Sequence, residues 1–90
     1  MIEQTVVVKN RLGIHARPAA LLVQKASKFQ ADIFFSKGEI RHINGKSIMG
    51  VMMLAAEQGA EITIETEGED EIEAARALAE LLQSNFEDQV

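Results

Sequence analysis

The chain has no cysteine, no tryptophan, no tyrosine and only one proline in 90 residues. Without cysteine it can form neither a disulfide nor a cysteine-ligated zinc site, and thiol chemistry is excluded. Basic residues are also few, because 9 Lys and Arg stand against 14 Asp and Glu and leave a net charge of −5. An acidic chain without a basic block, tryptophan or tyrosine argues against direct binding of nucleic acid.

Long apolar segments are absent as well. The first residues, Met1-Ile2-Glu3-Gln4, lack the basic start and the apolar run of a signal peptide. No stretch is long and apolar enough to cross a membrane, so we expect a cytoplasmic protein without membrane insertion. The length and the 47% hydrophobic content predict a single domain over residues 1–90 with a packed core.

Hydrophobic periodicity predicts the secondary structure. Alternating or β-branched runs indicate strands, and apolar residues at helical spacing indicate helices. The predicted strands cover 2–8, 32–36, 39–43 and 60–66, and the predicted helices cover 16–28, 48–58 and 70–85. This β-α-β-β-α-β-α order predicts an α+β fold, in which a four-stranded antiparallel sheet is covered on one face by three helices.

The same periodicity assigns the buried faces. In the strand over 60–66, Ile62 and Ile64 are expected to point to the core. In the helix over 48–58, the inward residues are expected to be Val51, Leu54 and Ala55. The apolar face of the last helix is predicted to comprise Ile72, Ala75, Leu78, Ala79, Leu82 and Phe86.

The stretch Gly13-Ile14-His15-Ala16-Arg17-Pro18 has the strongest chemical character in the chain. Pro18 suits the first turn of a helix, so the helix should begin close to Ala16 and place His15 at its N-terminus. Backbone N–H groups point outward there and favour anions. A neutral imidazole is a nucleophile, and the negative charge of a phosphoryl group on it would be stabilised by the helix end and by Arg17.

The alternative for His15 is a simple cap or surface residue, which is the commoner role of a lone histidine before a helix. Gly13 and Arg17 favour the functional interpretation, because glycine lets the loop close tightly and arginine binds phosphate well. No nucleotide-binding loop, metal cluster or second catalytic base accompanies the histidine. We therefore expect no cofactor and no metal, and a protein that is not an enzyme by itself.

A second segment, from Lys46 to Ala56, has a good N-cap in Ser47 and a helix stop in Gly59. Its helix carries no charge from Ile48 to Ala56, yet a helix in so small a domain buries only one face. The exposed remainder, Ile48, Met49 and Met52, suits a docking surface for a protein partner. Full burial of these residues is the alternative, and the pattern favours neither.

Two other polar features are predicted to be structural. The acidic run Glu69, Asp70, Glu71 and Glu73 is expected to be a solvated helix start that complements the helix dipole rather than a metal site. His42 is expected to be a surface residue of a short strand.

Together these motifs resemble the HPr family, the histidine-containing phosphocarriers of the bacterial sugar phosphotransferase system, over essentially the whole chain. Gly-Ile-His-Ala-Arg-Pro-Ala-Ala, from Gly13 to Ala20, is similar to the active-site signature of that family. The segment from Lys46 to Met52 resembles its regulatory serine segment in the form found in Gram-positive bacteria. The segment between the second strand and Ser47 is one residue longer than in common HPr sequences, and we place the extra residue within 37–45.

The resemblance implies an open-faced β-sandwich and a set of partners. Enzyme I would pass a phosphoryl group to Nδ1 of His15, assisted by Arg17, and Enzyme IIA domains would receive it. Ser47 would be phosphorylated by HPr kinase/phosphorylase, which would make the protein a corepressor for the catabolite-control repressor. We expect a monomer whose partner-binding residues are Ala16, Ala20, Ile48, Met49 and Met52.

Three alternatives remain. The first is a regulatory homologue of the Crh type that acts mainly through phosphorylated Ser47, although Crh proteins typically lack a histidine at the position of His15. The second is the nitrogen-branch phosphocarrier, which shares the histidine loop but is disfavoured by the Ser47 segment. The third is a plain α+β protein-binding module with an unreactive His15, which an acid-labile phosphate would exclude.

Overall fold

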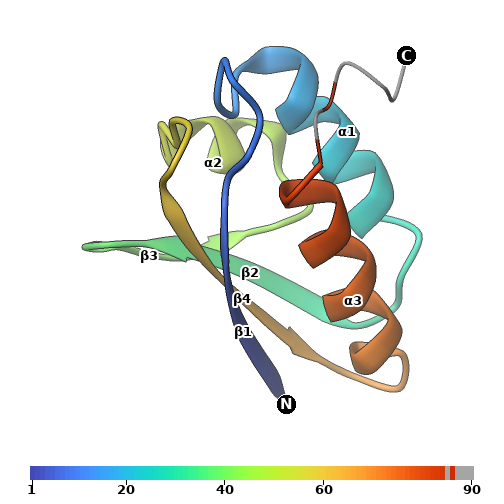
Figure 1. Cartoon of the computed structure of the whole chain (residues 1–90). Coiled ribbons are helices and arrows are strands. Elements are labelled where there is room, and N and C mark those ends of the chain that lie inside the picture. Colours follow the sequence, from blue (N-terminus) through green and yellow to red (C-terminus); the bar gives the residue numbers. More distant parts are fainter. Residues whose placement is uncertain (85, 87–90) are drawn as a thin grey trace.

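The computed structural model of the protein describes residues 1–84 and 86. The elements follow in the order β1 (Ile2–Val7), α1 (Ala16–Ala26), β2 (Asp32–Lys37), β3 (Ile40–Asn44), α2 (Ile48–Met53), β4 (Glu61–Glu67) and α3 (Glu71–Leu82) (Figure 1). The strands form one antiparallel sheet in the order β1-β4-β2-β3. The predicted α+β fold and its element order are therefore confirmed.

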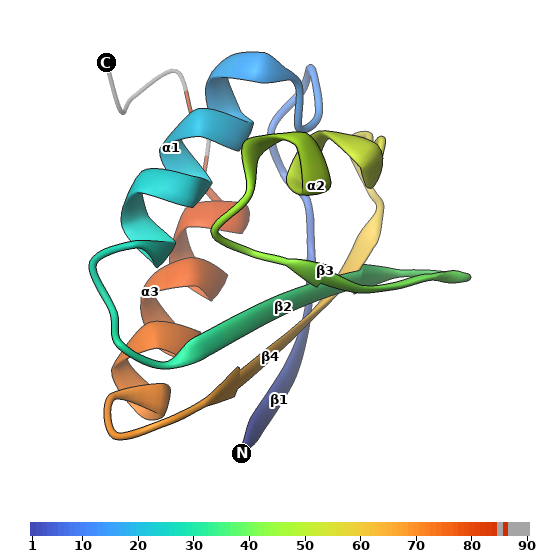
Figure 2. The same ribbon diagram turned by 180° about the vertical axis from the view of Figure 1, so that it is seen from behind.

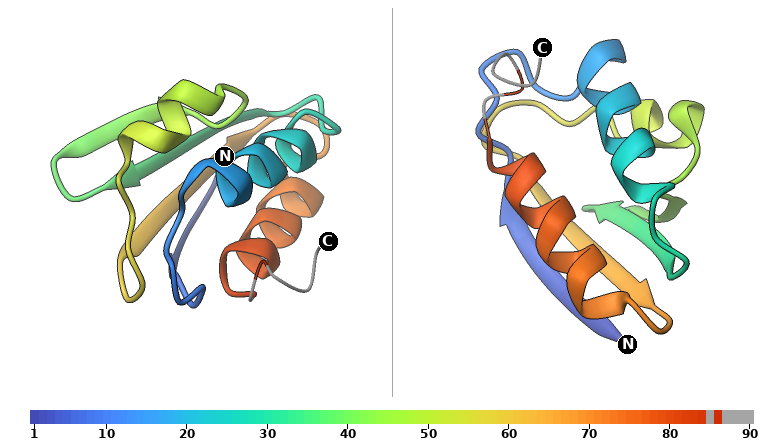
Figure 3. Two further views of the ribbon diagram at one scale, coloured as in Figure 1. Left: turned by 90° about the horizontal axis from the view of Figure 1, so that it is seen from above. Right: turned by 90° about the vertical axis from the view of Figure 1, so that its right-hand side faces the viewer.

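All three helices lie on one face of the sheet, and the other face is open (Figure 2). Helix α3 packs against β1 and β4, and α1 packs against both α3 and α2. Helix α2 lies over β3 at one end of the helical layer (Figure 3). This arrangement places the beginning of α1 and the whole of α2 at the same end of the molecule.

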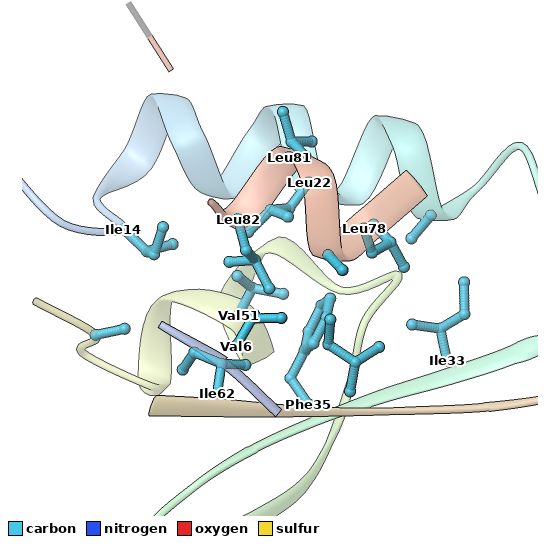
Figure 4. Packing of buried hydrophobic residues seen from close by; sticks show 14 of the residues in the cluster. Val6, Ile14, Leu22, Ile33, Phe35, Val51, Ile62, Leu78, Leu81 and Leu82 are labelled. Carbon is cyan, nitrogen blue, oxygen red and sulfur yellow. The ribbon is translucent and has the colours of Figure 1, made fainter. Parts of the chain in front are cut away.

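The core lies between the sheet and the helices (Figure 4). Strand β4 alternates as predicted, since Ile62 and Ile64 are fully buried. Phe35 of β2 is a large, fully buried side chain, which lies between the two layers with Leu78 of α3 and Leu22 of α1. Burial of these large side chains supplies the main favourable free energy of folding.

Helix α2 is shorter than predicted. It ends at Met53 rather than near Gln58, and Ala55 leaves helical geometry with a φ of 48°. The chain then returns to the sheet, where the N–H of Gly59 and the carbonyl of Ala60 pair with the backbone of Val8. These long-range hydrogen bonds compete with the continuation of the helix and end it early.

Two predicted inward residues are wrong. Ala55 is exposed because the left-handed backbone turns it out of the helix. Ile72 is 57% exposed, because it lies in the first turn of α3 and lines a surface pocket beside Ile2 and Gln4 of the edge strand β1 instead of entering the core. The other residues predicted for the apolar face of the last helix are buried: Ala75, Leu78, Ala79, Leu82 and Phe86.

The ends of α1 and α3 also differ from the prediction. Helix α1 ends at Ala26, and the chain continues through Lys28 and Phe29 with tighter hydrogen bonds to the third residue before. Helix α3 ends at Leu82, while the predicted last residue, Asn85, lies outside the described residues.

Strand β3 carries a bulge. Phe35 pairs with Ile43 and Lys37 with Ile40, so β3 has one more residue than β2 between these two pairs. His42 lies in the bulge with a φ of 60°, and its N–H donates to Oγ of Ser36 at 2.9 Å. The bulge falls inside 37–45, where we expected an extra residue.

Within residues 1–84 and 86, none of the helices has the length and apolar character that a membrane crossing requires.

Candidate functional site

His15 is the N-cap residue of α1, as the position of Pro18 predicts. Its backbone is extended, with φ −97° and ψ −161°, and its carbonyl accepts the first helical hydrogen bond from the N–H of Ala19 at 2.9 Å. The imidazole makes no capping hydrogen bond, and the side chain is exposed. His15 therefore caps the helix with its backbone and leaves both ring nitrogens available for chemistry.

The first turn of α1 presents donors beside this imidazole. The N–H groups of Ala16 and Arg17 precede the first intrahelical hydrogen bond, so helix geometry leaves them without a helical partner. Pro18 is buried and contributes no N–H. Arg17 is exposed, and no ion pair within residues 1–84 and 86 engages its guanidinium. Donors of this kind at a helix N-terminus suit an anion such as a phosphoryl group.

A hydrogen-bonded loop precedes His15 and positions it. The buried side chain of Asn10 donates from Nδ2 to the carbonyl of Gly13 at 2.7 Å, and the N–H of Gly13 donates back to the carbonyl of Asn10 at 3.0 Å. The N–H of the buried Ile14 donates to the carbonyl of Ala56 at 2.8 Å. The segment that follows α2 is thus bonded to the residue next to His15.

Gly13 is required by this arrangement, as predicted. Its φ is +75°, and a Cβ at this position would lie 2.5 Å from the carbonyl oxygen of Ala56. A side chain would therefore clash with the backbone against which the loop packs, and glycine lets the loop close.

Ser47 is the predicted N-cap of α2. Its Oγ accepts a hydrogen bond from the N–H of Gly50 at 3.1 Å, and its carbonyl accepts from the N–H of Val51 at 2.9 Å. The residue is half-buried. The preceding residue, Lys46, contacts the segment that follows α1, where its Nζ donates a hydrogen bond to the carbonyl of Phe29 at 2.8 Å.

The outer surface of α2 is apolar. Ile48, Met49 and Met52 are 45%, 78% and 44% exposed. These side chains are therefore on the surface, and the alternative of full burial is wrong. Met53 adds to this surface with 66% exposure. We call these four residues the α2 patch. Val51 and Leu54, on the opposite side of the helix, are buried as predicted.

Helix α1 contacts α2, which brings the His15 loop and the α2 patch to the same region of the surface (Figure 2). On α1, Ala16 is exposed and Ala20 is half-buried. The residues predicted to bind partners thus lie on two helices that contact each other.

Sequence reasoning missed two residues here. Leu12, in the His15 loop, is 66% exposed and is an apolar side chain close to His15 in sequence. An exposed leucine next to a motif glycine could have been noted as a contact residue. The role of Ala56 had no sequence signal, because it uses only a backbone carbonyl.

The acidic start of α3 is more structured than predicted. Asp70 accepts hydrogen bonds from the N–H groups of Gln30 at 2.9 Å and Ala31 at 2.8 Å. These bonds, first that from Gln30, lower the pKa of the Asp70 carboxyl, and the Lys46 ammonium contributes to the same shift. Within residues 1–84 and 86, no cluster of acidic or histidine side chains is arranged to hold a metal ion.

Glu71 links Met1 to the start of α3. The N–H of Gly68 donates to Glu71 at 3.0 Å, and the N-terminal ammonium of Met1 lies 3.2 Å from its carboxylate. Both contacts lower the pKa of the Glu71 carboxyl, the hydrogen bond from Gly68 most strongly.

His42 lies on the surface, as predicted. Its ring stacks on Phe34 with centroids 3.8 Å apart, and Nδ1 lies 3.9 Å from a carboxylate oxygen of Glu65. Unlike His15, it has no helix N-terminus beside it, because it belongs to strand β3.

Comparison with known proteins identifies the family. The family model described as "PTS HPr component phosphorylation site" matches residues 2–84. The phosphocarrier protein HPr of Treponema pallidum is 49% identical over 89 residues, which cover 99% of this chain and 100% of that protein. The chain therefore belongs to the HPr family, the phosphocarriers of the phosphotransferase system.

Solved structures agree with this assignment. HPr from Bacillus anthracis superposes with a TM-score of 0.86 at 50% identity, covering 91% of this chain and 96% of that chain. Crh, a catabolite repression protein of Bacillus subtilis, has a TM-score of 0.72 at 46% identity, covering 91% and 93%. That Crh structure is described as a dimer with a swapped domain.

Proposed function

We propose that His15 accepts a phosphoryl group from phosphorylated Enzyme I and passes it to Enzyme IIA domains. The observation that carries the proposal is the exposed imidazole of the α1 N-cap, free of any capping bond, beside the donors of the first turn. A ring nitrogen of His15 forms a bond to phosphorus as the bond to the donor breaks. The reverse exchange, with the acceptor as nucleophile, releases the phosphoryl group.

Two groups stabilise the charge of the phosphorylated state. The N–H groups of Ala16 and Arg17 point out of the helix end, and the Arg17 guanidinium can approach the phosphoryl oxygens as a charge-assisted donor. Both partners supply the remaining catalytic groups, so the protein acts as a carrier rather than as an independent enzyme.

The α2 patch and α1 residues Ala16 and Ala20 form the proposed docking surface for Enzyme I and Enzyme IIA. A donor must bring its active site to His15, so the surface around His15 must contact the donor. The α2 patch is continuous with this position, because α1 contacts α2 and Ile14 is bonded to Ala56. Exposed methionines adapt to different partner shapes, as a carrier with two partners requires.

We further propose that phosphorylation of Ser47 by HPr kinase/phosphorylase regulates this docking. The serine precedes the α2 patch directly, so its phosphate would place about two negative charges beside Ile48 and Met49. Docking of Enzyme I would weaken through desolvation of that charge, whereas a repressor that offers arginines would bind better.

The substitution Ser47→Asp tests the electrostatic part of this regulation. We expect slower phosphotransfer from Enzyme I to the Ser47→Asp protein than to a Ser47→Asn protein of similar shape. Equal rates for the two variants would contradict the electrostatic explanation.

The second candidate function is that of a Crh-type regulator, favoured by the 46% identity to the Bacillus subtilis Crh chain. Such a protein would act through phosphorylated Ser47 and the catabolite-control repressor, without carrying phosphate on its histidine. The histidine at position 15 favours the carrier.

The deciding experiment incubates the protein with Enzyme I and phosphoenolpyruvate and measures its intact mass before and after mild acid. The chain has 2 histidines, which provides a matched pair of variants, His15→Ala and His42→Ala. We expect one acid-labile phosphate on the wild type and on His42→Ala, and none on His15→Ala. Absence of phosphate on folded wild-type protein would contradict the carrier function and leave the Crh-type regulator as the remaining candidate.

We also propose a cytoplasmic monomer, because one exposed histidine must meet two partners in turn. The swapped dimer described for Crh does not favour this proposal. Light scattering after gel filtration tests it, and a stable dimer at working concentrations would contradict it.

A further inference from the structure

The oxidisable side chains of this protein are distributed unevenly. The chain contains no cysteine, tryptophan or tyrosine, so its 4 methionines are its main targets for mild oxidants. All of them are exposed: Met1 69%, Met49 78%, Met52 44% and Met53 66%. The buried core contains aliphatic side chains and phenylalanine but no methionine.

Three of these methionines belong to the α2 patch. Met49 and Met53 are the most exposed, and Met53 lies just before the segment whose Ala56 carbonyl holds the His15 loop. Oxidant that reaches the protein therefore attacks the proposed docking surface and spares the core.

We propose that Met49, Met52 and Met53 form a reversible oxidation site that controls docking at His15. The inference rests on the proposed carrier function. A peroxide is the oxidant: one oxygen atom moves from hydrogen peroxide to the thioether sulfur, which loses two electrons and becomes a sulfoxide, and water is released. Methionine sulfoxide reductases return the thioether with electrons from a thiol donor.

The physical effect is a change of polarity without a change of fold. A sulfoxide converts a flexible apolar side chain into a polar one, which must be desolvated when a partner covers it. We expect the kcat/KM of phosphotransfer from Enzyme I to fall about tenfold, the loss expected when the burial of one apolar side chain is removed. The melting temperature should stay unchanged because the core holds no methionine.

The experiment treats the full chain with hydrogen peroxide and confirms by peptide mass that Met49, Met52 and Met53 each carry one added oxygen. Phosphotransfer from Enzyme I, thermal melting and direct phosphorylation by phosphoramidate are then measured. Phosphoramidate needs no docking surface, so its reaction with His15 should be unaffected. Reductase treatment should restore transfer from Enzyme I.

The matched control carries Met49→Leu, Met52→Leu and Met53→Leu, which keep the apolar surface and cannot be oxidised. A second control with Met49→Leu and Met53→Leu alone serves if the triple variant fails to fold. Each variant is compared with its own untreated sample: peroxide should leave the transfer rate of the triple variant unchanged and lower that of the double variant less than that of the wild type. Met1 is oxidised in every sample and acts as an internal control.

Several outcomes overturn the proposal. They are full Enzyme I activity of the oxidised wild type, equal inactivation of the leucine variants, and a lowered melting temperature after oxidation. Failure of the carrier function itself is seen separately, because untreated protein would then receive no phosphate from Enzyme I.

Discussion

His15 and His42 show how backbone surroundings separate two chemically equal side chains. His15 caps a helix whose first N–H groups are free, while His42 sits in a strand bulge with its ring stacked on Phe34. Both are exposed. Only the first has donors placed to hold the oxygens of a phosphoryl group, so position rather than residue type defines the candidate acceptor.

Gly13 gives the sharpest residue-level prediction. Gly13→Ala should destabilise the fold by about 1–3 kcal/mol and slow phosphotransfer, because φ is +75° and the new Cβ meets the carbonyl of Ala56. Gly38→Ala is the matched control, since its φ is +57° but nothing lies within 4 Å of the new Cβ. Urea denaturation and Enzyme I assays measure both. Equal effects of the two variants would contradict the role of the close contact.

Asp70 predicts a pH dependence of stability. Its pKa is lowered in the folded protein, so the ionised carboxylate stabilises the fold above its unfolded pKa, and this stability is lost as the pH falls through the folded pKa. Asp70→Asn should therefore melt at a lower temperature than the wild type at pH 7, and the difference should shrink in strong acid. Melting curves across the acid range test this. A difference independent of pH would exclude the carboxylate hydrogen bonds as its cause.

The residues whose side chains carry the proposed chemistry could be predicted from sequence, but the backbone contacts that hold them in place could not. His15, Arg17, Pro18 and Ser47 stand where helix-start chemistry placed them. The bonds that anchor the His15 loop come from Ala56, distant in sequence, and use only backbone atoms. Such contacts depend on how elements meet in three dimensions, which periodicity does not encode.

Helix α2 is the element on which the proposed regulation depends. At six residues it is too short to be stable alone, and it is held by the Ser47 cap and by burial of Val51 and Leu54. The predicted length of α2 was wrong, because Gly59 can end a helix only if the helix reaches that residue. Here the helix ends earlier, since the segment 59–60 forms backbone hydrogen bonds with Val8.

The cap gives a prediction at this scale. Ser47→Ala removes the acceptor for the N–H of Gly50 and should cost about 1 kcal/mol of folding free energy. Ser27→Ala, at the exposed C-terminal end of α1, is the control and should change stability by less than about 0.5 kcal/mol. Urea denaturation measures both. A Ser47→Ala protein as stable as the control would show that the cap contributes nothing.

The whole molecule combines a core of aliphatic and phenylalanine side chains with an apolar patch on α2 and an open sheet face. The fold class and the order of the elements agreed with the sequence pattern, because the alternation in β4 directly indicates a strand with one solvent-exposed face. The helix faces were predicted less well, since Ile72 fits the helical period but stays exposed beside the edge strand β1. Periodicity defines an apolar stripe on a helix but not which residues of that stripe the neighbouring strand leaves exposed.

Core packing gives the prediction for the molecule as a whole. Leu78→Ala, at a fully buried position, should destabilise the protein by about 2–5 kcal/mol, a large part of the total stability of a small domain. Ile72→Ala on the same helix removes an exposed side chain and should cost less than about 0.5 kcal/mol. Thermal and urea denaturation compare them. Similar losses would contradict the burial described for α3.

The most direct test of the account follows one phosphoryl group through the protein. Protein phosphorylated by Enzyme I is separated from its donor and mixed with an Enzyme IIA domain, and the intact masses of both are measured over time. The account predicts that the phosphate leaves the wild-type and His42→Ala proteins and appears on the Enzyme IIA domain. His15→Ala should carry none to transfer. A phosphate that forms on wild-type protein and remains there, or is lost only to water, would contradict the role of His15 as a carrier.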